Sequence, residues 1–343
     1  MIFMKHKSYN RKRTLLSIIA MVLTACLLLL GFQIFLTLDE YFGRVAASDD
    51  DEYAYQNGGR PEYLVDGKWY IQKDKVKTYL LIGIDKYEAA IRNKNGYRNN
   101  EQSDAIFLVV VDTENKEYSI IHINRDTMAN IRMLDINGNP YNSFEGQLAL
   151  SHTYGSGRED SCENTMWSVS EYLYGLQIDH YASVSMDAVA VLNDKIGGVT
   201  LTVSDDMTAV DKTLKQGETV TLKGEHALNY IRSRQGLANS TNLERMKRQR
   251  QYITEFIKKA KTAIKLNNGL SSDMILSVSD YLVSDLTADE LLSMTDVLES
   301  YSFDGIISID GEVRQGEKFM EFYADESALK KLVLDTFYEE SIR

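Results

Sequence analysis

Short apolar runs, each bounded by polar or turn-forming residues, recur along the chain from about residue 78 onwards. The runs at residues 79–83, 105–111 and 118–123 are rich in valine, isoleucine and leucine, which is typical of buried β-strands. Shorter apolar or alternating patterns predict further strands at residues 68–72, 181–185, 199–203, 230–234 and 305–309. A β-sheet is therefore expected at the centre of the fold.

Apolar residues also recur at helical spacing between many of these strands. The patterns predict helices at residues 165–176, 186–196, 242–264 and 327–338. The glycine pair Gly197-Gly198 ends the second of these helices. A capping box opens one more helix, at residues 287–290. Because strands and helices interleave, the sequence predicts an α/β or α+β sandwich.

The hydrophobic pattern is different near the N-terminus, where residues 14–38 contain no charged side chain. A helix of these 25 residues could cross a hydrocarbon core of roughly 30 Å. Basic residues precede the segment and acidic residues follow it, at Lys5, Lys7, Arg11, Lys12, Arg13, Asp39 and Glu40. Because basic flanks stay inside, we expect a single-pass protein of the cell membrane, with a cytoplasmic N-terminus and an extracellular C-terminal domain. The alternative, a cleaved signal peptide, is disfavoured by the length of the apolar run.

Shifts in composition divide the rest of the chain. An acidic run at residues 49–52 and a turn signal at residues 57–59 indicate a linker before the first strong strand. The predicted organisation is a cytoplasmic tail (1–13), a transmembrane helix (14–38), an extracellular linker (39–77), a core (78–265) and a C-terminal part packed on the core (266–343).

The charge balance excludes one class of partner. Lysine and arginine number 38 against 50 aspartates and glutamates, which gives a net charge of −12. The charged residues of segment 1–38 are five bases, so residues 39–343 carry −17. A nucleic-acid-binding protein would usually be basic. The two cysteines, Cys26 and Cys162, cannot form a disulfide outside the membrane, and the five histidines show no metal-ligand spacing.

Two aspartates stand at the ends of neighbouring predicted strands. Asp85 follows the first strong apolar run and Asp104 precedes the next. Adjacent strand ends can bring two carboxylates together around Mg²⁺, which prefers oxygen ligands and often bridges substrate phosphates. The alternative is a pair of solvated acids. Arg125 and Asp126 leave the third strand and are a weaker signal, because exposed arginine–aspartate neighbours usually contribute little.

A dense group of basic residues lies in this otherwise acidic chain. Arg232 and Arg234 alternate in a predicted strand and would share one of its faces. Arg245, Arg248 and Gln249 would share one face of the helix that follows. Such a cluster suits phosphate or pyrophosphate, because arginine offers a planar fork of donors. The alternative is a solvated helix face with internal salt bridges.

In this order, and behind such an N-terminal segment, the motifs of the chain resemble the LytR–CpsA–Psr (LCP) family of bacterial cell-envelope enzymes. The resemblance covers about residues 78–265 together with the N-terminal anchor. It rests on Leu80-Leu81-Ile82-Gly83-Ile84-Asp85, Ser103-Asp104, Asn124-Arg125-Asp126-Thr127, Tyr154-Gly155, Ile178-Asp179-His180-Tyr181, Gly197-Gly198-Val199, Leu222-Lys223-Gly224-Glu225-His226-Ala227-Leu228, Tyr230-Ile231-Arg232-Ser233-Arg234 and Arg245-Met246-Lys247-Arg248-Gln249.

The resemblance implies an α/β fold, with a central mixed sheet sandwiched by helices and a hydrophobic tunnel for a lipid. It implies an Mg²⁺-dependent phosphotransferase that moves a glycopolymer, of the teichoic acid or capsular polysaccharide type, from a polyprenyl-pyrophosphate carrier to peptidoglycan. The alternative is a non-catalytic envelope module that binds the polyprenyl-pyrophosphate ligand or acts as a regulator. A third possibility is hydrolysis of the carrier by the same site.

The resemblance also assigns roles to individual residues. Asp85 and Asp104 would hold Mg²⁺, and Arg125, Asp126 and Arg234 would act in catalysis. The pyrophosphate would be bound by Arg125, Arg232, Arg234, Arg245, Arg248 and Gln249, of which Arg248 is the weaker member.

The chain departs from the family pattern before the predicted strand at residues 105–111 and after the one at residues 118–123. Gln102 stands where the family usually has an arginine, and Arg98 could replace the lost basic contact. Asn124 stands where the family usually has a proline, which changes the turn but keeps the charges of Arg125 and Asp126.

A further departure concerns the general base. Many members carry an aspartate in the loop before the helix at residues 242–264, whereas this chain has Asn239 and Asn242. An amide cannot take a proton. The base for the acceptor hydroxyl would then be Asp126, Glu244 or a phosphate oxygen.

Overall fold

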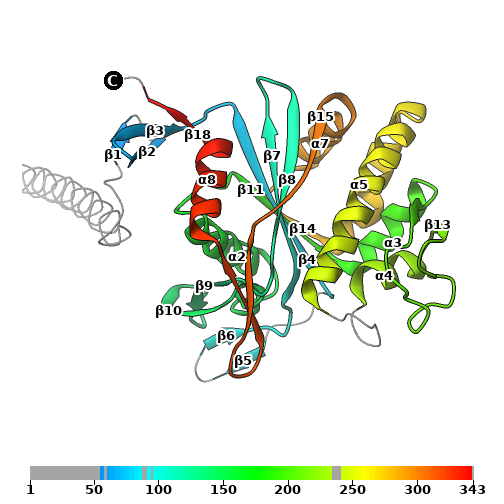
Figure 1. Cartoon of the computed structure of the whole chain (residues 1–343), viewed down its shortest axis with the longest axis horizontal. Helices are drawn as coiled ribbons and strands as arrows, with labels where there is room; N and C mark the ends of the chain where they lie inside the picture. Colours follow the sequence, from blue (N-terminus) through cyan, green and yellow to red (C-terminus); the bar gives the residue numbers. More distant parts are fainter. Residues whose placement is uncertain (1–54, 58–59, 87–90, 94–95, 234–240, 342–343) are drawn as a thin grey trace, which may run out of the picture. The chain divides into compact units, whose positions relative to one another are not determined.

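Figure 1 shows the computed structural model, which describes residues 55–57, 60–86, 91–93, 96–233 and 241–341. The chain divides into two compact units. The larger unit spans residues 73–337, and the smaller one contains the described residues before and after it. The predicted tail (1–13) and transmembrane helix (14–38) lie outside the described residues. Within the described ranges, no helix combines the length and the apolar character needed to span a membrane.

A six-stranded mixed sheet forms the centre of the larger unit. Its strand order is β14-β11-β4-β7-β8-β15. Strand β7 is antiparallel to both β4 and β8, whereas β11 runs parallel to β4 and β15 runs parallel to β8. The bounds are β4 Val76–Ile84, β7 Ser103–Asp112, β8 Glu117–Ile123, β11 His180–Ser185, β14 Leu282–Ser284 and β15 Ser302–Ser308. This sheet confirms the central mixed sheet expected from the sequence.

Helices cover both faces of this sheet (Figure 1). Helix α5 (Asn242–Leu266) and helix α7 (Ala288–Ser300) lie on one side, and α2 (Glu159–Tyr172) and α8 (Glu326–Phe337) lie on the other. Side chains of a strand alternate between its two faces, and alternate residues of β7 and β8 pack towards Ile257 of α5. These residues are Ala105, Phe107, Val109, Val111, Tyr118 and Ile120.

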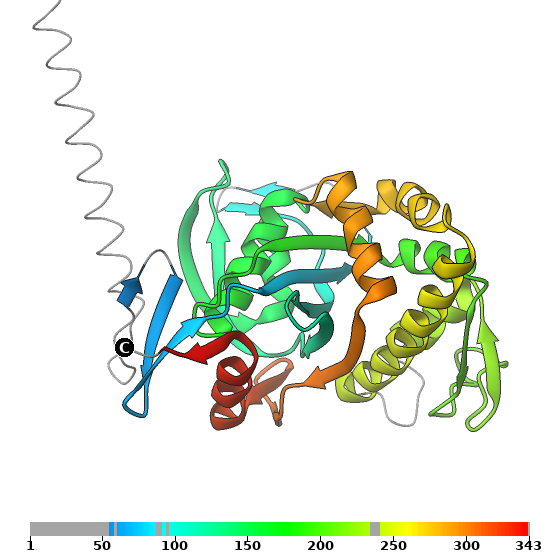
Figure 2. The same cartoon turned by 90° about the horizontal axis from the view of Figure 1, so that it is seen from above.

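A second apolar core lies at one end of the larger unit (Figure 2). Here α5 packs with α3, α4 and α6 and with a two-stranded sheet of β12 and β13. Val199, Tyr230, Tyr252 and Met274 are among its buried side chains. The bounds are α3 Met186–Lys195, β12 Val199–Thr202, β13 Thr219–Leu222, α4 Glu225–Arg232 and α6 Leu270–Val278. Helix α5 therefore contributes to both cores, which fixes its position against the sheet.

Short hairpins and 3₁₀ turns complete the larger unit. They are β5 Ile91–Asn93 with β6 Gly96–Arg98, β9 Met128–Leu134 with β10 Pro140–Gln147, η1 Leu148–Thr153, η2 Ser279–Tyr281, and β16 Gly311–Gln315 with β17 Met320–Ala324. The smaller unit is a sheet of order β1-β2-β3-β18. Its strands are β1 Tyr55–Asn57, β2 Arg60–Val65, β3 Lys68–Gln72 and β18 Tyr338–Glu340.

Most predicted strands and helices are confirmed, with shifts at their ends; α2 begins six residues before the predicted residue 165. The capping box at Thr287 is present. The strand predicted at residues 230–234 is wrong over its described part, because Tyr230, Ile231 and Arg232 belong to α4 and Ser233 is its C-cap. Ala227, Tyr230 and Ile231 are the buried residues of that segment, and their spacing of three and four residues is helical.

The predicted domain boundaries differ from the observed ones. The strand predicted at residues 68–72 is confirmed, but together with residues 60–65 it forms part of a compact smaller unit and not of a linker. The segment at residues 266–337 belongs to the same compact unit as the predicted core. It supplies β15 as an edge strand and α7 as a covering helix, so the boundary at residue 265 has no structural counterpart.

A buried arginine joins α5 to the end of α4. The Arg248 side chain is 1% exposed, and its Nε donates to the carbonyl oxygen of Tyr230 at 3.0 Å. Its Nη2 donates to the carbonyl oxygen of Ser233, and its Nη1 lies 3.4 Å from the Asp205 carboxylate. Carbonyl groups in the last turn of a helix lack intrahelical donors. Arg248 therefore caps α4 from the neighbouring helix.

A buried histidine stabilises the turn η1. The Nδ1 atom of His152 lies 3.2 Å from the carbonyl oxygen of Glu101, and the whole residue is inaccessible to solvent. Burial is the main cause that lowers the pKa of His152 to about 4. The side chain is therefore neutral at pH 7.

We expect Arg248→Met to lower the free energy of unfolding by about 2–4 kcal/mol, because it leaves buried carbonyl groups without donors. The matched change Arg232→Met, at a half-exposed arginine paired with Asp85, should cost at most about 1 kcal/mol. Urea denaturation followed by tryptophan fluorescence measures both. Equal losses in the two variants would contradict the capping role of Arg248.

We expect the protein to lose stability as the pH falls below the ordinary histidine value of about 6.5. The unfolded chain then binds a proton at His152 that the native state does not accept until the pH approaches the pKa of about 4. This residue alone accounts for a loss on the order of 3 kcal/mol between these two pH values. Urea denaturation at pH 7.5, 6, 5 and 4 should show a shallower dependence for His152→Gln than for the wild type. Parallel curves would contradict the assignment.

Candidate functional site

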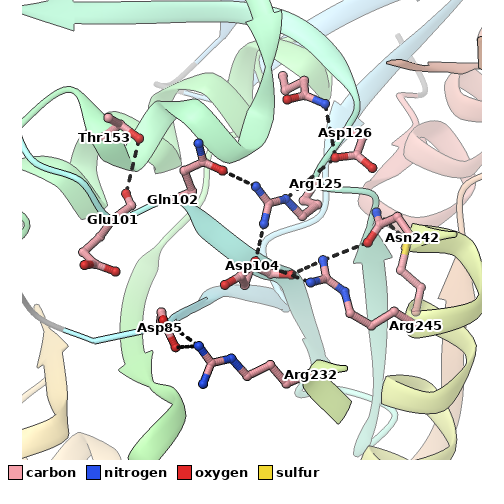
Figure 3. A network of polar contacts seen from close by, with 12 residues as sticks. Asp85, Glu101, Gln102, Asp104, Arg125, Asp126, Thr153, Arg232, Asn242 and Arg245 are labelled. Carbon is pink, nitrogen blue, oxygen red and sulfur yellow. Dashed lines mark hydrogen bonds and ion pairs between the residues drawn. The ribbon is translucent and has the colours of Figure 1, made fainter. Parts of the chain in front are cut away.

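Two aspartates lie where β4 ends and β7 begins. Gly83 pairs with Ala105 and Ile84 pairs with Ser103, so Asp104 is one extra residue in β7. Such a β-bulge changes the direction of a side chain. It lets Asp104 reach Arg245 of α5, although Ala105 also packs on the side of the sheet that α5 covers. The predicted proximity of Asp85 and Asp104 at one edge of the sheet is visible in Figure 3.

Two nearly buried arginines meet at Asp104 (Figure 3). The Oδ1 atom of Asp104 accepts a hydrogen bond from Nη1 of Arg125 and lies 3.5 Å from Nη1 of Arg245. Arg245 also donates through Nη2 to the carbonyl oxygen of Asp104 at 3.2 Å. The side chains of Arg125 and Arg245 are only 9% and 4% exposed. Two guanidinium groups therefore share one carboxylate in a poorly hydrated place.

Arg232 and Asp85 form a second ion pair at the same edge of the sheet (Figure 3). The Nη2 atom of Arg232 lies 2.7 Å from both carboxylate oxygens of Asp85. Unlike the arginines at Asp104, these side chains are 53% and 41% exposed. Arg232 reaches this place from the last residue of α4, not from a strand.

The turn after β8 carries Arg125 and Asp126. The Oδ1 atom of Asn124 accepts a hydrogen bond from the backbone N–H of Asp126 at 3.0 Å, and the carbonyl oxygen of Asn124 accepts one from the N–H of Thr127 at 3.1 Å. An asparagine side chain that bonds two residues ahead stabilises a turn. The turn is thus held by a side chain at the position where the family usually has a proline.

The carboxylate of Asp126 is held on two sides. Its Oδ1 atom accepts a hydrogen bond from Nε2 of Gln147 at 3.2 Å and lies 3.7 Å from Nε of Arg125. Gln147 also donates to the carbonyl oxygen of Met320 at 2.8 Å, and the N–H of Phe322 donates to the carbonyl oxygen of Asp126 at 2.9 Å. The β16–β17 hairpin thereby supports Asp126. Sequence reasoning missed this support, because the contacts join segments that are almost 200 residues apart.

Several predicted site residues lie elsewhere. Arg248 caps α4, and Nε2 of Gln249 donates to the carbonyl oxygen of Ile231 in the same helix, at 3.3 Å. The guanidinium of Arg98 lies over the ring of Tyr154, 5.3 Å from its centroid. Gln102, at the position where the family usually has an arginine, accepts a hydrogen bond from Nη2 of Arg125 through its Oε1 atom. Arg234 and Asn239 lie outside the described residues.

The candidate bases differ in their surroundings. The Oε1 atom of Glu244 lies 2.6 Å from Nζ of Lys247, one turn further along α5. Asp126 instead lies beside Arg125, which contacts Asp104. Of these two carboxylates, Asp126 is the one that lies next to the arginine cluster formed by Arg125 and Arg245 at Asp104.

A buried histidine lies near the arginines and was not assigned a role from the sequence. The ring of His122 is 4.2 Å from that of Phe107, between centroids, and the residue is 1% exposed. Burial first, and then the charges of Arg250 and Arg245, lower the pKa of His122 well below its ordinary value. The imidazole is therefore neutral and adds no charge beside Arg245.

The donor chemistry of Asp85 and Asp104 is compatible with Mg²⁺. This ion is commonly bound by one or two carboxylates, with water and substrate phosphates completing its shell. Among the described residues, no group of three or more histidine, cysteine or acidic side chains is placed to hold a metal. Both carboxylates also contact arginines, so a cation would share them. Mg²⁺ stays a prediction.

Curated proteins with similar sequences include a biofilm regulatory protein and a teichoic acid transferase. The chain is 25% identical to the biofilm regulatory protein A of Streptococcus mutans over 248 residues, which are 68% of this chain and 57% of the relative. It is 29% identical to the polyisoprenyl-teichoic acid–peptidoglycan teichoic acid transferase TagT of Bacillus subtilis over 193 residues, which are 54% of this chain and 53% of the relative. The chain thus spans little more than half the length of these relatives.

Solved structures share the fold. The structure of TagT bound to LIIa-WTA superposes with a TM-score of 0.58 at 23% identity, covering 77% of this chain and 91% of that one. The protein gbs0355 of Streptococcus agalactiae gives a TM-score of 0.60 at 20% identity, covering 78% and 90%. At such identities the superpositions establish the fold alone.

The sequence profile of the LytR_cpsA_psr family matches residues 41–333. This range covers most of the chain, including both carboxylates at the sheet edge, the turn after β8 and the whole of α5. The match and the shared fold show that this chain belongs to the LytR–CpsA–Psr (LCP) family.

Proposed function

We propose that the protein transfers a glycopolymer, of the teichoic acid or capsular polysaccharide type, from a polyprenyl-pyrophosphate carrier to peptidoglycan. The observation that carries the proposal is the pair of nearly buried arginines, Arg125 and Arg245, that converge on Asp104. The names of the relatives, which include teichoic acid transferases and a cell wall biosynthesis protein, support this class of reaction.

The arginine cluster suits a pyrophosphate better than a neutral ligand. The guanidinium groups of Arg125 and Arg245 are almost buried, and Asp104 and Asp126 lie beside them. Hydrogen bonds from these groups to an anion would form where the local dielectric is low, which strengthens them. The oxygens of a pyrophosphate would accept hydrogen bonds from both guanidinium groups, which is the geometry that arginine favours. Arg232, which is exposed and lies beside Asp85, would contribute a further donor from the solvent side of the site.

Mg²⁺, if bound, would be held by Asp85 and Asp104, and would supply positive charge to the oxygens of the pyrophosphate. The arginines would serve the same end through hydrogen bonds fixed by the fold. Negative charge grows on the bridging oxygen as the polyprenyl phosphate leaves, and donors that are already in place stabilise it without reorganisation.

The transfer forms one bond and breaks one. The hydroxyl oxygen of the acceptor sugar attacks the phosphorus attached to the glycopolymer and forms a phosphodiester, while the bond from this phosphorus to the bridging oxygen breaks. The hydroxyl proton would go to Asp126, whose carboxylate is positioned by Gln147 beside Arg125. Polyprenyl phosphate leaves with the electron pair of the broken bond.

The lipid would lie where the sheet faces α5 and α7. Apolar side chains are only partly buried there, on strands and on both helices: Tyr79, Leu81, Ile253, Met294, Val297 and Ile306. An unsaturated hydrocarbon chain could cover them. The uncharged segment at residues 14–38 would anchor the protein in the membrane that contains the carrier.

We expect Arg245→Ala to weaken binding of the carrier by roughly 10- to 150-fold, the scale of one charge-assisted hydrogen bond. The assay uses the full chain, a polyprenyl-pyrophosphate-linked saccharide, peptidoglycan fragments and Mg²⁺, with attachment followed by mass spectrometry. Arg158→Ala, at an exposed arginine on α2's N-terminal side, is the control and should behave as the wild type. Equal activity of both variants would remove the arginine cluster from the proposed site.

We expect Asp126→Asn to reduce the turnover number by about 10²–10⁴-fold, the contribution typical of a general base. Carrier binding should change little, because the amide oxygen can still accept the hydrogen bond from Gln147. The separation of turnover from binding is measured by titrating the carrier in the same assay. Release of polyprenyl phosphate without attachment, in the wild type and without acceptor, would indicate a hydrolase instead. Binding without either reaction would indicate a non-catalytic module.

A further inference from the structure

Two amide side chains meet between the turn after β8 and the first turn of α5 (Figure 3 labels Asn242). The Nδ2 atom of Asn242 donates a hydrogen bond to Oδ1 of Asn124 at 2.7 Å. Asn124 is 3% exposed, and Asn242 is half-buried. Hydrogen bonds at such sites are strengthened by the low local dielectric.

The orientation of each amide is fixed by a neighbour that can only donate. The Oδ1 atom of Asn124 also accepts the backbone N–H of Asp126 at 3.0 Å. The Oδ1 atom of Asn242 accepts Nη2 of Arg245 at 2.8 Å. An oxygen must therefore face the donor in both cases, which leaves the NH₂ group of Asn242 to face Asn124.

The resulting chain of hydrogen bonds connects the two halves of the proposed site. It runs from Arg245 through Asn242 and Asn124 to the backbone of Asp126. At one end Arg245 contacts Asp104, where the anion would bind. At the other end Asp126 presents the carboxylate that would take the proton.

We propose that Asn242 and Asn124 form a bridge that positions Arg245 and Asp126 relative to each other, so that Asn242 is a positioning residue and not a proton acceptor. The inference rests on the proposed function, because the two ends of the bridge are defined by that function. The requirement at the two positions is unequal. Position 124 needs only an acceptor, whereas position 242 needs a donor and an acceptor at once.

The two asparagines of the bridge are chemically matched to each other. A proline at position 124 has no side-chain oxygen to accept from Asn242. An aspartate at position 242 would place a carboxylate oxygen against Oδ1 of Asn124, and two acceptors repel each other. The asparagine at each position is therefore matched to the asparagine at the other.

The unequal requirement gives a matched pair of variants, Asn124→Asp and Asn242→Asp. Each adds one negative charge at nearly the same place. The new carboxylate in Asn124→Asp would keep both hydrogen bonds as an acceptor, whereas the one in Asn242→Asp would keep the bond from Arg245 and lose the bond to Asn124. In the transfer assay with the full chain, the two variants are compared with each other, because each adds the same charge near the proposed anion site. We expect Asn242→Asp to fall at least about 10-fold below Asn124→Asp, on the scale of one lost hydrogen bond between buried groups.

Alanine variants provide a second measurement. If the two residues act as one bridge, the double variant Asn124→Ala/Asn242→Ala should be no less active than the weaker single variant, because either change removes the same contact. Melting temperatures within a few degrees of the wild type would exclude a general loss of the fold.

The outcomes separate the inference from the proposed function. Equal losses in the two aspartate variants, additive losses in the alanine variants, or a higher turnover in Asn242→Asp than in the wild type would each overturn the bridge while leaving the transferase in place. Absence of transfer in the wild type would overturn the proposed function, and the inference with it.

Discussion

The site depends on one electrostatic constraint: two guanidinium groups are kept almost out of water around a single carboxylate. Arg125 comes from the turn after β8, Arg245 comes from the first turn of α5, and Asp104 lies in a bulge of β7. These three elements must therefore keep fixed positions relative to one another. The six-stranded sheet fixes the turn after β8 and the bulge of β7, and the packing of α5 into two apolar cores fixes its first turn.

This constraint separates two kinds of arginine that look alike in the sequence. Arg245 and Arg248 lie one turn apart on α5 and are both buried. Arg245 contacts the carboxylate of Asp104, which Arg125 also contacts, whereas Arg248 donates to carbonyl groups of α4. The role of a buried arginine therefore depends on the acceptor groups that it contacts. Carbonyl oxygens at a helix end use up the donors of Arg248, whereas Arg245 shares its carboxylate with a second arginine at the proposed anion site.

The sequence was sufficient to predict elements whose pattern is local. The apolar runs of β4, β7 and β8 and the helical spacing of α5 required no knowledge of distant residues. Tyr230 and Ile231 show the limit, because a short alternation in the sequence was also compatible with the helical packing of α4. In the site, Asp85, Asp104 and Arg125 were found because strand ends collect at a sheet edge. Helical spacing correctly grouped Arg245, Arg248 and Gln249, but it carries no information about the element that this face meets. The roles of Gln147 and of the Asn124–Asn242 contact depend on side-chain geometry across long separations, for which the sequence has no local signal.

The β16–β17 hairpin determines how far the larger unit can be shortened without affecting the site. A fragment that stopped at residue 265, the predicted end of the core, would lack the edge strand β15 and the backbone groups at Met320 and Phe322 that support Gln147 and Asp126. Such a fragment would retain Arg125 and Arg245, but the carboxylate of Asp126 would lose the contacts that position it. The smallest fragment that retains the described site is therefore set by the hairpin, and its natural limit is the end of α8.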